Sequence, residues 1–212
     1  MSGEQGYGKY VAFCGIVKSG KGTQIGLLEG DLKEKYPGRE VVMVIEPGGT
    51  DIANALRKLV QGTYFGEEMN LVTEALIYAA ARAQSVPALV RPVLKRGGIV
   101  LSDRCYVDSL AIQGFGRGVP LNLIGEVNYA AIGATRPDKV LVLDLELRKA
   151  LARGLDPAED KFEGFGVEFW ERVRGGYKFL AEKEPGLITI VDAEGTKEEV
   201  RLRVSQALLG VV

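Results

Sequence analysis

The residues best suited to chemistry lie in a glycine-rich segment near the beginning of the chain. Residues 15–24 read Gly-Ile-Val-Lys-Ser-Gly-Lys-Gly-Thr-Gln, which matches the pattern G-x-x-x-x-G-K. Glycines at this spacing let successive backbone N–H groups face one anion, and a helix that starts after the loop adds about half a positive charge at its N-terminus. Lys21 can then reach the terminal phosphates of a nucleotide. The segment therefore predicts a phosphate-binding loop.

The residue after Lys21 departs from the usual form of this loop. Gly22 stands where Ser or Thr is usual, so one hydroxyl is missing from the expected magnesium position. The run Gly-Lys-Gly-Thr-Gln looks like the phosphate loop of adenylate kinases, and we expect Mg²⁺ to be held mainly through water, phosphate and Thr23. The loop residues that we expect to bind ATP are Gly15, Lys18, Ser19, Gly20, Lys21, Gly22, Thr23 and Gln24.

Two further loops carry charged residues that can act on a phosphate. Glu46 opens the segment Glu-Pro-Gly-Gly-Thr, and its carboxylate can orient the water shell of a magnesium ion. Asp103 can hold Mg²⁺ through water, and the adjacent Arg104 can neutralise charge on a phosphoryl group during transfer. An isolated Asp-Arg pair is more often a surface ion pair, but its position after an apolar run favours the catalytic interpretation.

Five short apolar runs must position these loops. Most are continuously apolar, which is typical of parallel strands buried on both faces, and helical patterns separate them. The strands are expected at residues 10–14, 40–45, 99–102, 139–144 and 187–191, and the helices at 23–36, 51–60, 69–81, 86–94, around 169–180 and from 196 onward. This alternation predicts an α/β fold, a parallel five-stranded sheet flanked by helices, in a single domain of residues 1–212. Ligands bind beyond the carboxyl ends of the strands in such sheets, so the charged loops are expected to meet there.

The composition excludes several other functions. With 27 Lys plus Arg against 28 Asp plus Glu, the net charge is −1, which gives no reason to expect a nucleic-acid polymer as partner. Histidine is absent, so mechanisms that need an imidazole are excluded. Two cysteines cannot form a disulfide framework, and a reducing, cytoplasmic setting is the default expectation. No run approaches the roughly 20 apolar residues of a membrane helix, and the first ten residues carry no signal-peptide pattern, so we expect no membrane partner.

Several motifs, in order along the chain, resemble the thymidylate kinase family. In that family a phosphate loop is followed by R-E-P-G-G-T, A-A-x-R-A-Q, D-R-Y-x-D-S-S-x-A-Y-Q-G and D-R-x-E segments, and then by F-x-E-R-V-R-x-G-Y. The counterparts here are residues 46–50, 80–84, 103–114, 160–163 and 169–177, so the resemblance runs from about residue 10 to about residue 205. It implies a P-loop NTPase fold of the nucleoside monophosphate kinase type, with ATP and Mg²⁺ as cofactors. The implied reaction moves the γ-phosphoryl of ATP to dTMP, giving dTDP and ADP.

The resemblance also implies roles for residues on the acceptor side. Tyr78 matches an aromatic residue that stacks on thymine, and Arg82 matches an arginine that faces the thymine edge. Residues four apart share one face of a helix, so these two side chains point the same way; core packing is the alternative for Tyr78. Arg57 matches an arginine that holds the acceptor monophosphate, and Ser109 and Gln113 match polar contacts to the base.

The transfer itself needs two polyanions held in line rather than a strong base, because the acceptor phosphate is already anionic. Arg104 matches the family arginine that bridges the donor and acceptor phosphates, and Lys18 resembles a catalytic cation that some members place in the phosphate loop. A lid is expected at about residues 154–166, and Lys161 within it and Arg153 just before it can supply cations to ATP. A homodimer is expected by resemblance. The residues expected to act in catalysis are Lys21, Arg104, Lys18, Asp103 and Glu46.

Four positions differ from the family pattern. Val17 replaces an acid that binds the sugar 3′-hydroxyl, and the other differences are Ile45, Cys105 and Ile112, which replace Arg, Tyr and Tyr. These differences cluster on the acceptor side, so three alternatives stay open: the same chemistry with another acceptor such as dUMP or UMP, a non-catalytic nucleotide-binding paralogue, and a P-loop ATPase or GTPase that works as a switch. The sequence has no N-K-x-D tetrad, which counts against a GTPase.

Overall fold

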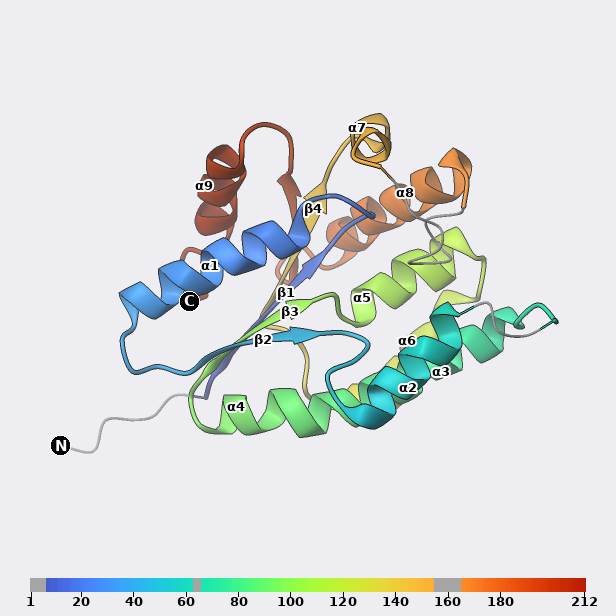
Figure 1. The fold of residues 1–212 in the computed structure, drawn as a ribbon, viewed down its shortest axis with the longest axis horizontal. Coiled ribbons are helices and arrows are strands. Elements are labelled where there is room, and N and C mark those ends of the chain that lie inside the picture. Colours follow the sequence, from blue (N-terminus) through green and yellow to red (C-terminus); the bar gives the residue numbers. More distant parts are fainter. Residues whose placement is uncertain (1–6, 63–65, 155–164) are drawn as a thin grey trace.

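A computed structural model describes residues 7–62, 66–154 and 165–212, and its centre is a five-stranded parallel sheet (Figure 1). The strands are β1 (Lys9–Cys14), β2 (Val41–Ile45), β3 (Ile99–Asp103), β4 (Lys139–Asp144) and β5 (Ile188–Asp192). They lie in the order β2-β3-β1-β4-β5, and every neighbouring pair is parallel. The predicted fold class is therefore confirmed, and each predicted strand agrees with an observed one to within one residue at either end.

Burial explains why the inner strands are continuously apolar. In β1, β3 and β4 nearly every side chain is buried, whereas the edge strands β2 and β5 leave several side chains partly exposed. A strand covered on both faces gains free energy from apolar residues at every position, whereas an edge strand does so only on its covered side. The phosphate loop thus follows the central strand, which is the most firmly held part of the sheet.

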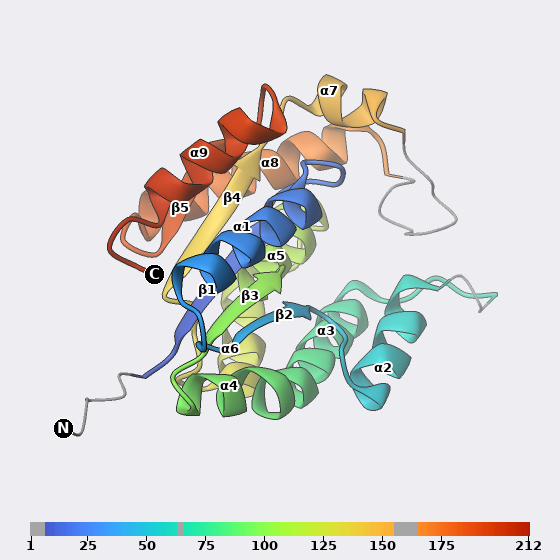
Figure 2. The ribbon, with the colours of Figure 1, turned by 60° about the vertical axis from the view of Figure 1, so that its left-hand side comes forward.

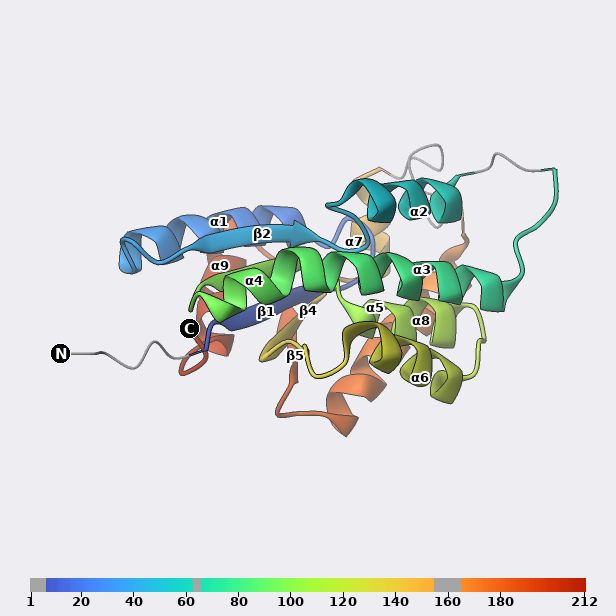
Figure 3. The same ribbon diagram turned by 90° about the horizontal axis from the view of Figure 1, so that it is seen from below.

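Helices cover both faces of the sheet. Figure 2 shows α1 (Lys21–Lys35) and α9 (Lys197–Ala207) together on one face, with α6 (Leu121–Ile132) and α8 (Val167–Lys183) across the other. Seen from below in Figure 3, α2 (Asp51–Gln61) and α3 (Leu71–Ser85) extend beyond the carboxyl end of β2.

Four segments differ from the sequence prediction. The helix expected at residues 86–94 is a continuation of α3, through the π-helical segment η1 (Val86–Val90) into α4 (Arg91–Lys95). No helix was predicted for α5 (Tyr106–Ser109) with the π-helical segment η2 (Leu110–Gly116), for α6 or for α7 (Leu147–Ala152). In α6 the buried positions Ile124, Asn128 and Ile132 recur every four residues, a helical spacing that the polar Asn128 obscures in the sequence. Of the helices in the described part of the chain, none is both long and apolar enough to cross a membrane.

Candidate active site

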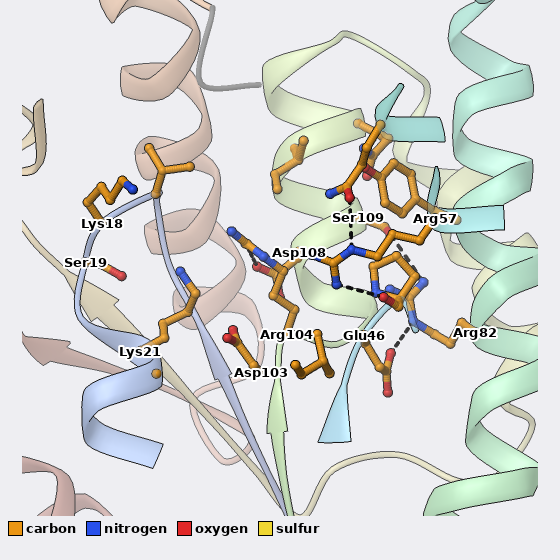
Figure 4. A pocket seen from close by; sticks show the side chains of 18 of the residues that line it. Lys18, Ser19, Lys21, Glu46, Arg57, Arg82, Asp103, Arg104, Asp108 and Ser109 are labelled. Atoms are coloured by element: carbon orange, nitrogen blue, oxygen red, sulfur yellow. Dashed lines mark hydrogen bonds and ion pairs between the residues drawn. The ribbon is translucent and has the colours of Figure 1, made fainter. Parts of the chain in front are cut away.

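A cavity of about 390 Å³ opens where the carboxyl ends of β1, β2 and β3 meet. Figure 4 shows Lys18, Ser19 and Lys21 on one side of it, Glu46 and Arg82 on the other, and Asp103 and Arg104 between them. The predicted residues that line it are Lys18, Ser19, Gly20, Lys21, Gly22, Thr23, Glu46, Arg57, Tyr78, Arg82, Asp103, Arg104, Ser109 and Gln113. The structure thus brings together residues that lie up to about 95 positions apart in the sequence, as the sheet topology predicts.

The glycine-rich loop has the backbone shape that its sequence predicts. Gly15 and Gly20 have φ angles of 137° and 97°, in the region that favours glycine. A side chain on Gly15 would place its Cβ 2.7 Å from the carbonyl oxygen of Leu143. Beyond Gly20 the chain enters α1, so the N-terminus of a 15-residue helix faces the loop. The Ser19 Oγ is buried and has no hydrogen-bond partner among the described residues, which suits a site that receives a polar ligand.

Lys21 lies inside this loop with its ammonium group turned to the backbone. Its side chain is 7 % exposed, and Nζ donates to the carbonyl oxygens of Gly15 (3.2 Å) and Ile16 (3.0 Å). Burial, and then the nearby positive charge of Arg104, lower the pKa of Lys21 to about 8. A bound phosphate would supply the opposite charge that this buried cation needs.

Three other residues that were predicted to contact ATP lie in different places around the loop. Arg153 donates from Nη1 to the carbonyl oxygen of Lys18 at 2.7 Å, so it already touches the loop from the C-terminal end of α7. Thr23 is exposed at the rim of the cavity. Gln24 instead donates from Nε2 to the carbonyl oxygen of Lys197 at 3.0 Å, which ties α1 to α9. A contact of Gln24 with ATP therefore stays a prediction, and most of the expected lid, including Lys161, lies outside the described residues.

Arg104 lies between the two sides of the cavity and is firmly held. Its backbone has a φ of 76°, unusual for a residue other than glycine. Its Nη1 donates to Asp108 Oδ1 at 2.6 Å and to the carbonyl oxygen of Gly15 at 3.3 Å. The same Asp108 oxygen accepts from the Tyr177 hydroxyl at 2.7 Å, and the other Asp108 oxygen accepts from the backbone of Cys105 at 3.1 Å. Burial lowers the pKa of Arg104, but the charges of Asp108, Tyr177 and Asp103 and the hydrogen bond to Asp108 together outweigh this effect, so the net pKa is raised and the guanidinium stays charged.

The residues around Asp103 fit a magnesium ion held through water. One carboxylate oxygen of Asp103, Oδ1, is buried without a hydrogen-bond partner among the described residues, as is the nearby Ser19 Oγ. Both residues line the cavity, and both offer oxygen ligands, which Mg²⁺ prefers while keeping several of its waters. When bound with ATP, the ion would neutralise phosphate charge.

The opposite wall centres on a buried ion pair. Arg82 and Glu46 are each 2 % exposed, and Arg82 Nε donates to Glu46 Oε2 at 2.6 Å. Glu46 Oε1 accepts from the Tyr10 hydroxyl at 2.8 Å. Glu46 Oε2 thus positions Arg82, while Oε1 is held by Tyr10, and the role of Glu46 toward magnesium stays a prediction. The guanidinium Nη1 of Arg82 also donates to Ser109 Oγ at 3.3 Å and to Asn128 Oδ1.

Tyr78 and Arg57 complete this wall. Tyr78 lies one turn before Arg82 on α3, lines the cavity and is 7 % exposed, as both the stacking and the packing interpretations require. Arg57, on α2, donates to the carbonyl oxygen of Pro47 at 3.0 Å and to Gln61 at 2.9 Å, which aims it along the cavity rim.

Several residues of the site were not predicted as functional. Asp108 and Tyr177 fix Arg104, Asn128 fixes Arg82, and Trp170 lines the cavity from α8. Asp108 lies four residues after Arg104, a spacing at which charges pair on a helix, so the sequence held a signal for it. Asn128 gave no such signal, because its partner lies 46 residues earlier. Of the four positions that differ from the family pattern, Val17, Ile45 and Ile112 line the cavity, whereas Cys105 is buried beside Cys14.

This fold, with its phosphate loop and cationic second wall, defines the chain as a P-loop phosphotransferase of the nucleoside monophosphate kinase class. Comparisons with known proteins identify the family. The thymidylate kinase family model matches residues 13–204. The thymidylate kinase of Desulforudis audaxviator is 47% identical over 188 residues, 88% of this chain and 84% of that protein, and the one of Trichodesmium erythraeum is 38% identical over 95% of each chain. The crystal structure of thymidylate kinase from Ehrlichia chaffeensis matches with a TM-score of 0.76 at 28% identity, covering 95% of this chain and 99% of that one. The chain belongs to the thymidylate kinase family, which confirms the resemblance seen in the sequence.

Proposed function

We propose that this protein transfers the γ-phosphoryl group of ATP to dTMP and releases dTDP and ADP. One observation carries the proposal: a single cavity joins the phosphate loop and Lys21 to a second wall that holds Arg57, Arg82 and Arg104. Two polyanions can therefore lie end to end along one cavity, which is the arrangement that phosphoryl transfer needs.

On the donor side, the loop amides and the N-terminus of α1 bind the ATP phosphates, and Lys21 turns from the carbonyl groups of Gly15 and Ile16 to the terminal phosphates. Lys18 and Arg153 add positive charge at the outer side of the loop. Asp103 and Thr23 would hold Mg²⁺, and the ion would neutralise charge on the ATP phosphates.

On the acceptor side, Arg57 binds the dTMP phosphate and Tyr78 stacks on the base. Arg82, Ser109 and Gln113 contact the edge of the base. Arg104 reaches both phosphates, because Asp108 and Tyr177 hold it between the two walls. Its charge offsets the repulsion between donor and acceptor as the phosphoryl group moves.

We also propose that the enzyme is a homodimer and that it works in the cytoplasm. A homodimer is supported by exposed apolar side chains on α3 and α6, two helices that pack against each other: Val72, Leu76, Leu121 and Tyr129 are 38, 47, 36 and 72% exposed. Light scattering tests the dimer, and Leu76→Asp is expected to give a monomer.

A cytoplasmic location is supported by two thiols, Cys14 and Cys105, that lie 3.6 Å apart without being linked.

The experiment that tests the reaction is product analysis with ATP, Mg²⁺ and a panel of nucleoside monophosphates that includes dTMP, dUMP, UMP and dCMP. We expect dTDP to form fastest. Rapid formation of another diphosphate with little dTDP would show a different acceptor, and ADP without any nucleoside diphosphate from the acceptor would show an ATPase.

A further inference from the structure

A fully buried carboxylate lies behind the base-binding wall and has no part in phosphoryl transfer. Glu74 is 0% exposed and lies on α3, one turn before Tyr78 and two turns before Arg82, so all three share one helix face. Glu74 Oε1 accepts from Gln113 Nε2 at 3.3 Å, and Glu74 Oε2 accepts from Arg117 Nη2 at 3.4 Å. An acid this deeply buried is retained only where it has such partners.

The contact with Glu74 decides which end of the Gln113 amide meets the cavity. A carboxylate only accepts hydrogen bonds, so the amide nitrogen of Gln113 must turn toward it. Gln113 is 2% exposed and lines the cavity. With its nitrogen turned to Glu74, the amide offers a ligand its oxygen, which accepts a hydrogen bond.

Arg82, on the same wall, offers a ligand hydrogen-bond donors instead of an acceptor. A guanidinium only donates, and Nε and Nη1 of Arg82 are committed to Glu46, Ser109 and Asn128, which fixes the plane of the group. Besides the Ser109 hydroxyl, which can both donate and accept, the wall therefore presents a fixed donor, from Arg82, and a fixed acceptor, from Gln113. A 4-oxopyrimidine such as thymine or uracil has the complementary pair, a carbonyl at C4 and an N–H at N3. Cytosine has the reverse pair, an amino group at C4 and a lone pair at N3.

We propose that Glu74 is a positioning residue for base selection: by holding the amide of Gln113 in one orientation, it makes the acceptor site accept 4-oxopyrimidines and reject cytosine. This inference rests on the proposed function, since it assumes that the acceptor base lies against Arg82 and Gln113. Glu74 itself touches no substrate. Its removal allows the Gln113 amide to flip, after which the same side chain can donate to N3 of cytosine.

The test compares the wild type with Glu74→Gln, which keeps the shape of the side chain but can also donate a hydrogen bond. The measurements are kcat/KM for dTMP and dCMP at saturating ATP, and Kd for both nucleotides by calorimetry. We expect the dTMP-to-dCMP ratio to fall at least about tenfold, with an absolute gain on dCMP, because the Gln113 amide no longer turns its oxygen to the N3 lone pair of cytosine. The mismatch between Arg82 and the C4 amino group of cytosine is the same in both proteins and cancels in this comparison. The KM for ATP is expected to stay unchanged.

Arg117→Met is the matched control. It removes a different partner of Glu74 but leaves the bond to Gln113, so the ratio is expected to stay at the wild-type value. A merely structural role for Glu74 would lower the rates with both acceptors alike in Glu74→Gln, and an unchanged ratio would overturn the inference.

Two further outcomes remain informative. If Glu74→Gln fails to fold, Gln113→Met replaces it: loss of the accepting oxygen is expected to weaken dTMP binding and spare dCMP, and a wild-type binding ratio in that variant would contradict the inference. If the wild type forms no dTDP, the proposed reaction fails, while the two Kd values still report on the base-binding wall by themselves.

Discussion

Replacing Lys21 by methionine is expected to stabilise the nucleotide-free protein at neutral pH while abolishing phosphoryl transfer. Burial, and then Arg104, lower the pKa of Lys21 from 10.5 to about 8 in the folded protein. Keeping Lys21 charged in the folded protein at pH 7 therefore lowers the free energy of unfolding by about 3 kcal/mol. The variant also loses hydrogen bonds to the carbonyl groups of Gly15 and Ile16, each contributing about 1 kcal/mol. The net gain is about 1 kcal/mol, or a rise in melting temperature of about 2–4 °C for a chain of this size.

The pH dependence separates this explanation from a general packing effect. Between about pH 8 and pH 10.5 the unfolded chain holds the Lys21 proton and the folded protein does not, so the stability of the wild type rises with pH in that window. At about pH 9.5 the penalty has fallen to about 1.4 kcal/mol, so the advantage of Lys21→Met disappears.

The assay is thermal or urea unfolding of both proteins at about pH 7 and about pH 9.5, with Lys33→Met as control. Lys33 lies on the same helix, but it is exposed and pairs with Glu29 on the surface, so its replacement is expected to change stability little at either pH. A Lys21→Met variant that is less stable than the wild type at pH 7, or that shows the same difference at both pH values, would mean that the buried charge of Lys21 does not destabilise the folded protein. Addition of ATP is expected to stabilise the wild type but not the variant.

Three other perturbations test the site. Glu46→Ala leaves the Arg82 guanidinium buried without its carboxylate and is expected to cost about 3–5 kcal/mol, measured by urea unfolding; a loss below about 1 kcal/mol would mean that the pair is not buried as described. Tyr177→Phe removes a hydrogen bond that fixes Asp108 and Arg104, so kcat is expected to fall about tenfold with little change in the KM for ATP, and an unchanged kcat would contradict this. Chelation of Mg²⁺ by EDTA is expected to stop turnover, restored by excess Mg²⁺, while the melting temperature of the nucleotide-free protein stays within about 1 °C; full turnover in EDTA would exclude the role given to the ion.

The elements whose signal lies in adjacent residues could be predicted from the sequence. The five strands and the phosphate loop carry their signal in adjacent residues, since a strand buried on both faces needs a continuous apolar run and a tight loop needs its glycines. The gathering of Lys21, Glu46 and Arg104 around one cavity follows from parallel topology, which places successive strand ends at the same edge.

The sequence could not predict which side chain each charged residue of the site contacts. Glu46 and Arg82 are 36 residues apart, and no spacing rule links them; only the fold shows that Glu46 holds an arginine. The same is true of Asp108 and Tyr177, 69 residues apart, and of Glu74 and Gln113, 39 residues apart. Such pairs depend on which helix faces which, and residues of either charge look alike in a sequence whether they contact a substrate or a neighbouring side chain.

In the proposed reaction, ATP and the acceptor occupy opposite ends of one cavity, with Arg104 between their phosphates. Calorimetry with a bisubstrate compound, adenosine and thymidine joined through their 5′ positions by a chain of phosphates, tests this most directly. We predict that it binds far more tightly than either mononucleotide, that it displaces both ATP and dTMP, and that Arg104→Met removes most of the gain. Binding no tighter than that of ATP alone, with dTMP still able to bind, would contradict the account.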